Sequence, residues 1–155
     1  MAELDTVRLR DSQMDTVSLR NAFRTFTDAA TFRRFAIQLR RDAPQNSQYG
    51  RPPERGLRYW QDELWLQFRA QLPAAPESID AIRDAMLWCD LHEHSLVDGQ
   101  GFLVSGVYET PGFVDALESQ FPFGYGYWQL ICPECVTACK TWIARYAPDA
   151  ESEND

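Results

Sequence analysis

Histidine, cysteine and long hydrophobic runs are all scarce in this sequence. Its two histidines, His92 and His94, lie two residues apart, which leaves no arrangement that would serve a Ser/His/Asp triad. No apolar run comes near the roughly 18 residues that a membrane-spanning helix needs, and no charged segment leads into an apolar one. We therefore expect neither a membrane span nor a signal peptide, and we expect a cytoplasmic location.

The chain has only four cysteines in 155 residues. Thiols stay reduced in the cytoplasm, where paired cysteines more often bind a metal or carry redox chemistry than form structural disulfides. Apolar residues, in contrast, make up 45% of the chain, with five Trp, six Tyr and nine Phe. This length and composition allow a well-packed core, so we expect a folded protein that is loosely ordered only at its ends.

Charge is divided unevenly along the chain. Residues 1–70 carry twelve arginines against nine acidic residues, a net charge of +3, whereas residues 71–155 carry three basic and fourteen acidic residues, a net charge of −11. The acidic half would repel nucleic acid phosphates, so nucleic acid binding is disfavoured. That alternative requires arginines of the first half to share one face rather than to form an ordinary solvated helix surface. The candidates are Arg24, Arg33, Arg34, Arg40 and Arg41, the last four of which we expect off the apolar faces of their helix.

Two short clusters carry the metal-binding chemistry of the chain. Cys89 and His92 form a Cys-x2-His pair, and Cys132 and Cys135 form a Cys-Pro-Glu-Cys pair. A spacing of two residues lets both side chains of a pair reach one ion, and two such pairs supply the four ligands that hold zinc tetrahedrally. We therefore expect one structural zinc ion, Zn²⁺, bound by these four residues. His94 is the alternative to His92, although its longer spacing from Cys89 suits a tight turn less well.

Residues 88–146 order these features as a Cys-x2-His turn, a pair of strands and a Cys-x2-Cys turn that opens a helix. This order resembles the treble-clef and zinc-ribbon families of zinc-binding folds. The resemblance implies a knuckle at Cys89 and His92, a second turn at Cys132 and Cys135, and one structural zinc ion. The 39 residues between His92 and Cys132 exceed the usual ribbon gap of about 15–20 residues, which implies an inserted helix.

Hydrophobic periodicity and turn residues predict an α+β fold in which an N-terminal helical part packs on a zinc-stapled strand pair with a helix. Before the first metal-binding pair, we expect two helices from Thr16 onward, separated by a break near residues 28–31, with Thr31 as the cap of the second. An irregular loop at 43–56, a helix at 57–72 and a helix that starts at Glu77 or Ser78 follow. After that pair, the predicted elements are a turn at 98–101, strands at 102–108 and 125–131, a helix at 112–119 capped by Thr110, and a last helix that begins at the second cysteine pair.

The same patterns suggest how the chain is divided. We expect a loosely ordered N-terminus at residues 1–15, a helical region at 16–87, a treble-clef-like zinc module at 88–147 and an acidic tail at 148–155. We expect these parts to form one compact domain. Cys139 follows Cys135 by one helical turn, and we expect it to be a small buried residue rather than a further ligand.

Two kinds of catalysis compete with the structural zinc interpretation. A zinc deaminase needs a His-x-Glu sequence followed by Pro-Cys-x-x-Cys. Here Glu93 is adjacent to His92, and the proline lies between the two cysteines rather than before them. A thiol-disulfide redox protein would use Cys132 and Cys135, which lie between a strand and a helix. However, only twenty residues follow Cys135, too few for the rest of such a scaffold, and the Cys89 pair would have no role.

We therefore hypothesise a non-catalytic, zinc-stabilised protein that acts through a protein surface. An inhibitor or immunity-type protein of a bacterium, directed at a basic partner protein, would suit the acidic half. The alternatives are a metal-dependent hydrolase or deaminase-like enzyme that uses Glu93, and a redox protein that uses the Cys-Pro-Glu-Cys motif.

Overall fold

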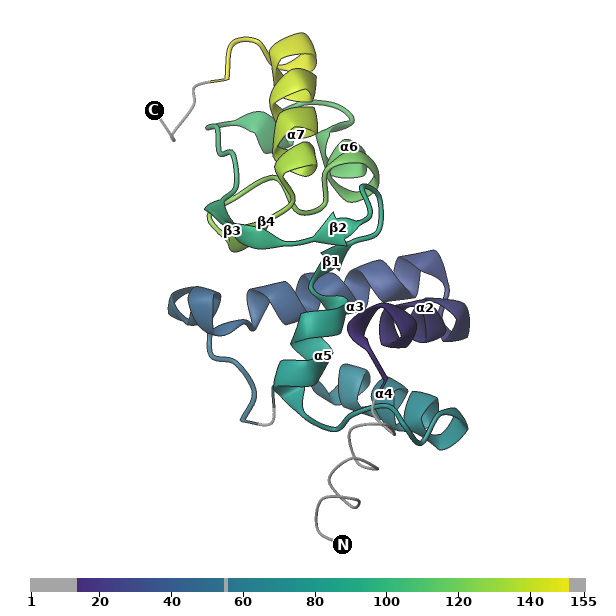
Figure 1. The fold of residues 1–155 in the computed structure, drawn as a ribbon. Coiled ribbons are helices and arrows are strands. Elements are labelled where there is room, and N and C mark those ends of the chain that lie inside the picture. Colours follow the sequence, from purple (N-terminus) through teal and green to yellow (C-terminus); the bar gives the residue numbers. More distant parts are fainter. Residues whose placement is uncertain (1–13, 55, 151–155) are drawn as a thin grey trace, which may run out of the picture. The chain divides into compact units, whose positions relative to one another are not determined.

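The computed structural model describes residues 14–54 and 56–150, so most of the expected loose N-terminus and of the acidic tail lies outside the described residues. The fold is α+β, with helices and two short antiparallel strand pairs (Figure 1). The chain divides into two compact units. The first contains the chain up to Leu39 and Pro52–Leu87, and the second contains Arg40–Arg51 and the chain from Trp88 onward.

The first unit is helical, as its hydrophobic periodicity predicts. Its helices are α2 (Thr16–Phe26), α3 (Ala29–Arg41), α4 (Tyr59–Gln71) and α5 (Ile79–Met86), and the last two residues of α3 belong to the second unit. The Asp28 carboxylate accepts a hydrogen bond from the Thr31 backbone N–H at 2.6 Å. The prediction that Thr31 caps α3 is therefore wrong, because Asp28, three residues earlier, provides the oxygen that the first turn needs.

Aromatic side chains form the core of the first unit. The Phe23 ring lies 4.9 Å from that of Phe35, 5.1 Å from that of Trp65 and 5.0 Å from that of Phe68, measured between ring centroids. Helices α2, α3 and α4 thus share one aromatic cluster. Some apolar side chains of α4 lie outside this core, because Tyr59 is 83% exposed and Leu66 is 58% exposed.

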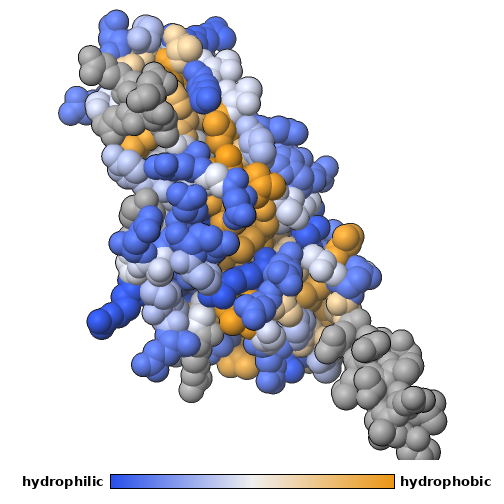
Figure 2. All heavy atoms as spheres, turned by 60° about the vertical axis from the view of Figure 1, so that its left-hand side comes forward, coloured by the Kyte–Doolittle hydropathy of each residue, from blue (hydrophilic) through white to orange (hydrophobic). Residues whose placement is uncertain are grey.

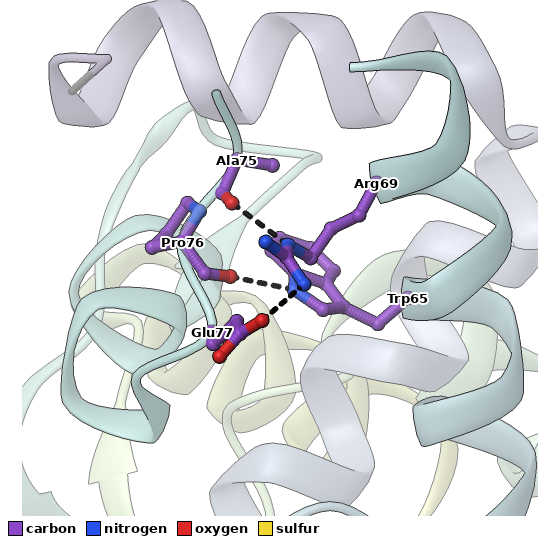
Figure 3. Close-up of polar contacts among 5 residues, drawn as sticks. All are labelled: Trp65, Arg69, Ala75, Pro76 and Glu77. Atoms are coloured by element: carbon purple, nitrogen blue, oxygen red, sulfur yellow. Dashed lines mark hydrogen bonds and ion pairs between the residues drawn. The ribbon is translucent and has the colours of Figure 1, made fainter. Parts of the chain in front are cut away.

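The segment after α4 folds back on that helix through polar contacts (Figure 3). The Trp65 indole N–H donates to the Pro76 carbonyl at 2.8 Å, and the Arg69 Nε donates to the Ala75 carbonyl at 2.9 Å. Arg69 also forms an ion pair with Glu77 at 2.6 Å. Ser78 then caps α5, so the predicted start of this helix is confirmed.

The second unit begins with the end of α3 and a 3-10 helix, η1 (Pro44–Tyr49). The sequence predicts an irregular loop here, but this part is ordered around Asn46, whose side chain is completely buried. The Asn46 amide donates to the Gln129 carbonyl at 3.0 Å and accepts from the Gln129 backbone N–H at 2.6 Å. One buried amide therefore fixes a strand that is 83 residues distant in the chain.

The strands of the second unit are shorter than predicted. Strand β1 (Trp88–Cys89) pairs with β2 (His94–Ser95), and β3 (Val97–Gln100) pairs with β4 (Gln129–Ile131), both antiparallel. The predicted strand at 102–108 is wrong, since it contains isolated bridges at Phe102 and Val104 and then a short 3-10 helix, η2 (Val107–Glu109). The turn predicted at 98–101 is wrong too, because β3 occupies most of it.

Backbone contact between glycines explains why the strand pattern misleads. A Cβ atom on Gly101 would lie 2.6 Å from the Gly126 carbonyl oxygen, so these two backbone segments approach each other at a distance that only glycine allows. Leu130 has a positive φ of 68°, which interrupts extended geometry inside β4. The prediction of one strand over 125–131 is therefore correct only at its C-terminal end.

Two helices complete the second unit, α6 (Phe113–Gln120) and α7 (Pro133–Tyr146), and they contact each other. Gly112, with φ of 85°, is the N-cap of α6, so the prediction of Thr110 in that role is wrong. The Phe113 ring lies 5.6 Å from that of Trp142 on α7. The start of α7 directly after Cys132 agrees with the sequence prediction.

Candidate metal centre

The first cysteine-histidine pair lies on a tight hairpin. Cys89 ends β1 and pairs with His94 at the start of β2, and the loop between them contains His92. The Glu93 backbone N–H donates to the Cys89 carbonyl at 2.8 Å, and Glu93 adopts a positive φ of 56°. This turn brings the His92 ring back over the Cys89 sulfur, with Nδ1 and Sγ 3.5 Å apart.

The second pair lies at a strand-to-helix junction. Cys132 follows β4 and is the N-cap residue of α7, while Pro133 takes the first helical position, where its fixed φ favours the helix. Cys135 is in the first turn, and its backbone N–H donates to the Cys132 sulfur at 3.4 Å. The local sequence therefore both starts the helix and places two sulfurs side by side.

The structure brings all four predicted residues together. Their ligand atoms, one from each of Cys89, His92, Cys132 and Cys135, lie within 4.8 Å of one another. The His92 Nδ1 is 3.3 Å from the Cys132 sulfur and 3.4 Å from the Cys135 sulfur, and the Cys89 and Cys135 sulfurs are 3.7 Å apart. The three cysteines are completely buried, and His92 is half-buried.

These distances fit a tetrahedral zinc ion. Bonds of about 2.3 Å to sulfur and about 2.1 Å to nitrogen place tetrahedral ligand atoms about 3.8 Å apart for two sulfurs and about 3.6 Å apart for sulfur and nitrogen. The measured separations of 3.7 Å and 3.3–3.5 Å are close to both values. The Cys3His cluster can therefore hold one metal ion, and its soft donors favour zinc over magnesium or calcium.

Backbone N–H groups surround the sulfur atoms. The backbone of His92 and of Leu91 favours the charged form of Cys89, and the backbone of Phe123 favours that of Cys135. The Cys132 sulfur accepts from Cys135, as described above. Hydrogen bonds of this kind stabilise the thiolate, which is the form of cysteine that binds a metal.

The thiols have different proton affinities because they contact one another. The hydrogen bond with Cys135 lowers the pKa of Cys89, and the same contact, together with burial, raises the pKa of Cys135. Burial also raises the pKa of Cys132. The donor set thus holds protons that a metal ion must displace on binding.

His94 contacts the cluster from outside. Its Nε2 is 3.3 Å from the Cys132 sulfur, while its Nδ1 is 3.0 Å from the Ser95 carbonyl oxygen. Only His92 places one nitrogen within 3.5 Å of all three sulfurs, so His92 rather than His94 fits the fourth ligand position.

The remaining candidates lie in other environments. Cys139 is completely buried, and burial raises the pKa of its thiol to about 12, as suits a small core residue. The Glu93 side chain, proposed for the enzyme alternative, is exposed. Of the arginines proposed for a basic face, Arg34 and Arg41 are exposed, but Arg40 is only 3% exposed. The prediction that Arg40 lies off the apolar face is therefore wrong.

Sequence reasoning missed two residues that fix the second pair, Arg40 and Asn46. The Arg40 Nε donates to the Leu130 carbonyl at 2.6 Å, and Asn46 bonds to Gln129, so both hold the strand that leads to Cys132. The only sequence signal was their type and position, a polar residue at the end of an amphipathic helix and another in a polar loop.

No family model matches this chain, and neither a curated protein nor a solved structure is similar to it. None of the helices in residues 14–54 and 56–150 combines the length and hydrophobicity that a bilayer span needs.

Proposed function

We propose that the second unit binds one structural zinc ion through Cys89, His92, Cys132 and Cys135, and that the protein acts by binding another protein rather than by catalysis. The observation that carries the proposal is the Cys3His cluster, whose ligand atoms lie within 4.8 Å of one another. The ion would join a hairpin to a helix start more than 35 residues away, which stabilises the intervening chain.

The arrangement supports a treble-clef-like module. A short hairpin provides the first ligand pair, and a turn that opens α7 provides the second, as the resemblance implies. Helix α6 lies between the two pairs in the chain and accounts for the long insertion.

A structural role follows from the number and burial of the donors. Four protein ligands complete a tetrahedral zinc site, whereas catalytic zinc sites keep one position open for water or substrate. Cys132 and Cys135 are completely buried, which also disfavours thiol exchange, because an attacking thiolate must be accessible.

A protein partner suits the surface of the second unit. Tyr108 and Tyr146 are 60% and 51% exposed, and both join the same internal aromatic cluster through Phe113 and Trp142. Acidic residues outnumber basic ones by eight to two in residues 88–150. Exposed tyrosines on a rigid, acidic unit favour a partner with a basic face. The face in Figure 2 is mostly hydrophilic, with apolar side chains among the hydrophilic ones.

The metal proposal is tested by measuring the zinc content of protein purified without a tag or added metal. We expect one zinc per chain in the wild type and in Cys139→Ala, and none after Cys132→Ser or His92→Ala. His94→Ala should keep the ion, since His94 contacts only one sulfur. Full zinc retention by both Cys132→Ser and His92→Ala would reject this ligand set.

The partner proposal needs a separate test. Crosslinking in a native extract should join the wild type to a basic protein, and Tyr108→Ser with Tyr146→Ser should lose this product while keeping the zinc. A crosslinked product that persists unchanged in the double variant, or a partner that is acidic, would contradict the proposed surface.

A further inference from the structure

Arg40 is a buried cation in the second unit, at the end of α3. Its side chain is 3% exposed, and it forms no ion pair with a carboxylate in the described part of the chain. Burying a guanidinium in a protein core costs free energy unless hydrogen bonds and an opposite charge compensate it. The contacts of Arg40 therefore indicate what the charge is for.

Three consecutive backbone carbonyls accept hydrogen bonds from Arg40. Its Nε donates to Leu130 at 2.6 Å and to Gln129 at 3.2 Å, and its Nη2 donates to Trp128 at 3.2 Å. These residues lie two to four positions before Cys132. Leu130 also has the positive φ of 68°, a conformation that a branched residue adopts only when its surroundings hold it there.

The carbonyls satisfy the N–H groups of Arg40, but they do not neutralise its charge. Cys135, one of the four proposed ligands, interacts favourably with the guanidinium and raises the pKa of Arg40. Burial lowers that pKa to about 10, so Arg40 still carries its proton at neutral pH. Arg41 acts in the opposite sense, but it is exposed to solvent.

The charge of the proposed metal centre completes the argument. Three thiolates, a neutral imidazole and a divalent ion sum to a net charge of −1, and the three sulfurs are completely buried. A buried anion and a buried cation attract each other more than exposed charges at the same separation, since water screens them less.

We infer that Arg40 is a positioning residue and the counter-charge of the metal centre: it holds the carbonyls of residues 128–130, and its positive charge offsets the net negative charge of a Cys3His zinc site. This inference rests on the proposed zinc site. The centre then has a fifth participating residue, which does not bind the metal and lies at the end of α3.

Two substitutions separate the charge from the hydrogen bonds. Arg40→Lys keeps the positive charge with fewer donors, and Arg40→Gln keeps an N–H donor without the charge. The matched control is Arg41→Gln, which removes a neighbouring but exposed guanidinium. Zinc dissociation constants of the full-length variants are measured by competition with a chromophoric chelator.

We expect Arg40→Gln to weaken zinc binding by about tenfold or more, in the range typical of residues that support metal ligands from outside. Arg40→Lys should stay within about threefold of the wild type, and Arg41→Gln should equal it. Equal weakening by Lys and Gln would overturn the counter-charge, and no weakening by either would overturn the inference entirely.

The design distinguishes the inference from the proposal on which it depends. Failure of the wild type to bind zinc in the same assay rejects the zinc site itself, and the counter-charge with it. If Arg40→Gln does not fold, Arg40→Lys alone decides the point, because a loss of more than tenfold with the charge retained contradicts a charge role.

Discussion

Gly124 shows at the scale of one residue how the second ligand pair is fixed. A Cβ atom at this position would lie 2.4 Å from the backbone carbon and oxygen of Cys135, a distance that backbone atoms do not tolerate. The chain can pass the first turn of α7 here only because glycine has no side chain. The requirement is steric, and it acts directly on a proposed ligand.

We therefore predict that Gly124→Ala destabilises the second unit by about 1–3 kcal/mol, as overpacking does, and weakens zinc binding. Gly50→Ala is the control, because nothing lies within 4 Å of a Cβ atom there. Urea unfolding and chelator competition measure the two effects. Wild-type behaviour of Gly124→Ala in both would show that the contact with Cys135 does not constrain the site.

Asp28 supplies a pH-dependent cap in the first unit. The hydrogen bond from Thr31 lowers the pKa of this exposed carboxyl below its ordinary value of 3.8. A lowered pKa in the folded state stabilises the fold above 3.8, and this contribution disappears as the pH falls through the folded-state value.

Asp28→Asn should keep the cap at every pH, since the amide oxygen also accepts the Thr31 N–H. We predict that the variant loses less thermal stability than the wild type between about pH 6 and pH 3. Asp28→Ala should be less stable than both at neutral pH. Identical acid profiles for Asp28→Asn and the wild type would show that the carboxylate does not contribute.

At the scale of elements, η1 and β4 depend on the buried Asn46. The side chain bonds to the Arg40 carbonyl at 2.8 Å as well as to both backbone groups of Gln129. Removing it takes a hydrogen bond from each of these backbone groups, although the Arg40 carbonyl still accepts from the Ala43 N–H and the Gln129 carbonyl from Arg40. Losing several hydrogen bonds at a buried site is expensive.

Asn46→Ala should therefore destabilise the second unit by about 1–3 kcal/mol and weaken zinc binding indirectly. Gln48→Ala, an exposed change in the same 3-10 helix, is the matched control. Amide hydrogen exchange should show lost protection at β4 in the first variant only. Unchanged exchange there would mean that β4 does not depend on Asn46.

Helices and the ligand pairs were more predictable than strands. The periodic apolar residues of α4 and the Ser78 cap of α5 are local signals, and so is the Cys-Pro start of α7. The strands failed because β3 and β4 are defined by long-range pairing and by the Gly101 and Gly126 approach. Arg40 and Asn46 were missed for the same reason, because their partners lie more than 80 residues away.

At the scale of the whole molecule, the proposed metal should affect the two units differently. The first unit has its own aromatic core around Phe23 and none of the four proposed ligands, whereas the second unit contains all of them. Loss of the ion would leave a cluster of buried polar sulfurs without their central charge.

We predict that a strong chelator increases amide exchange throughout α6 and α7 but leaves α4 protected. Stability lost on chelation should return when one equivalent of zinc is added. Equal loss of protection in α4 and α7 would show that the ion stabilises the entire chain, and no loss in either would remove its structural role.

The most direct test of the zinc site is X-ray absorption spectroscopy at the zinc edge on untagged, full-length protein. We predict one zinc per chain, surrounded by three sulfur atoms at about 2.3 Å and one nitrogen at about 2.1 Å. His94→Ala should leave this spectrum unchanged. A first coordination sphere with oxygen or with fewer sulfurs, or protein without zinc and with four free thiols, would contradict the structural Cys3His centre.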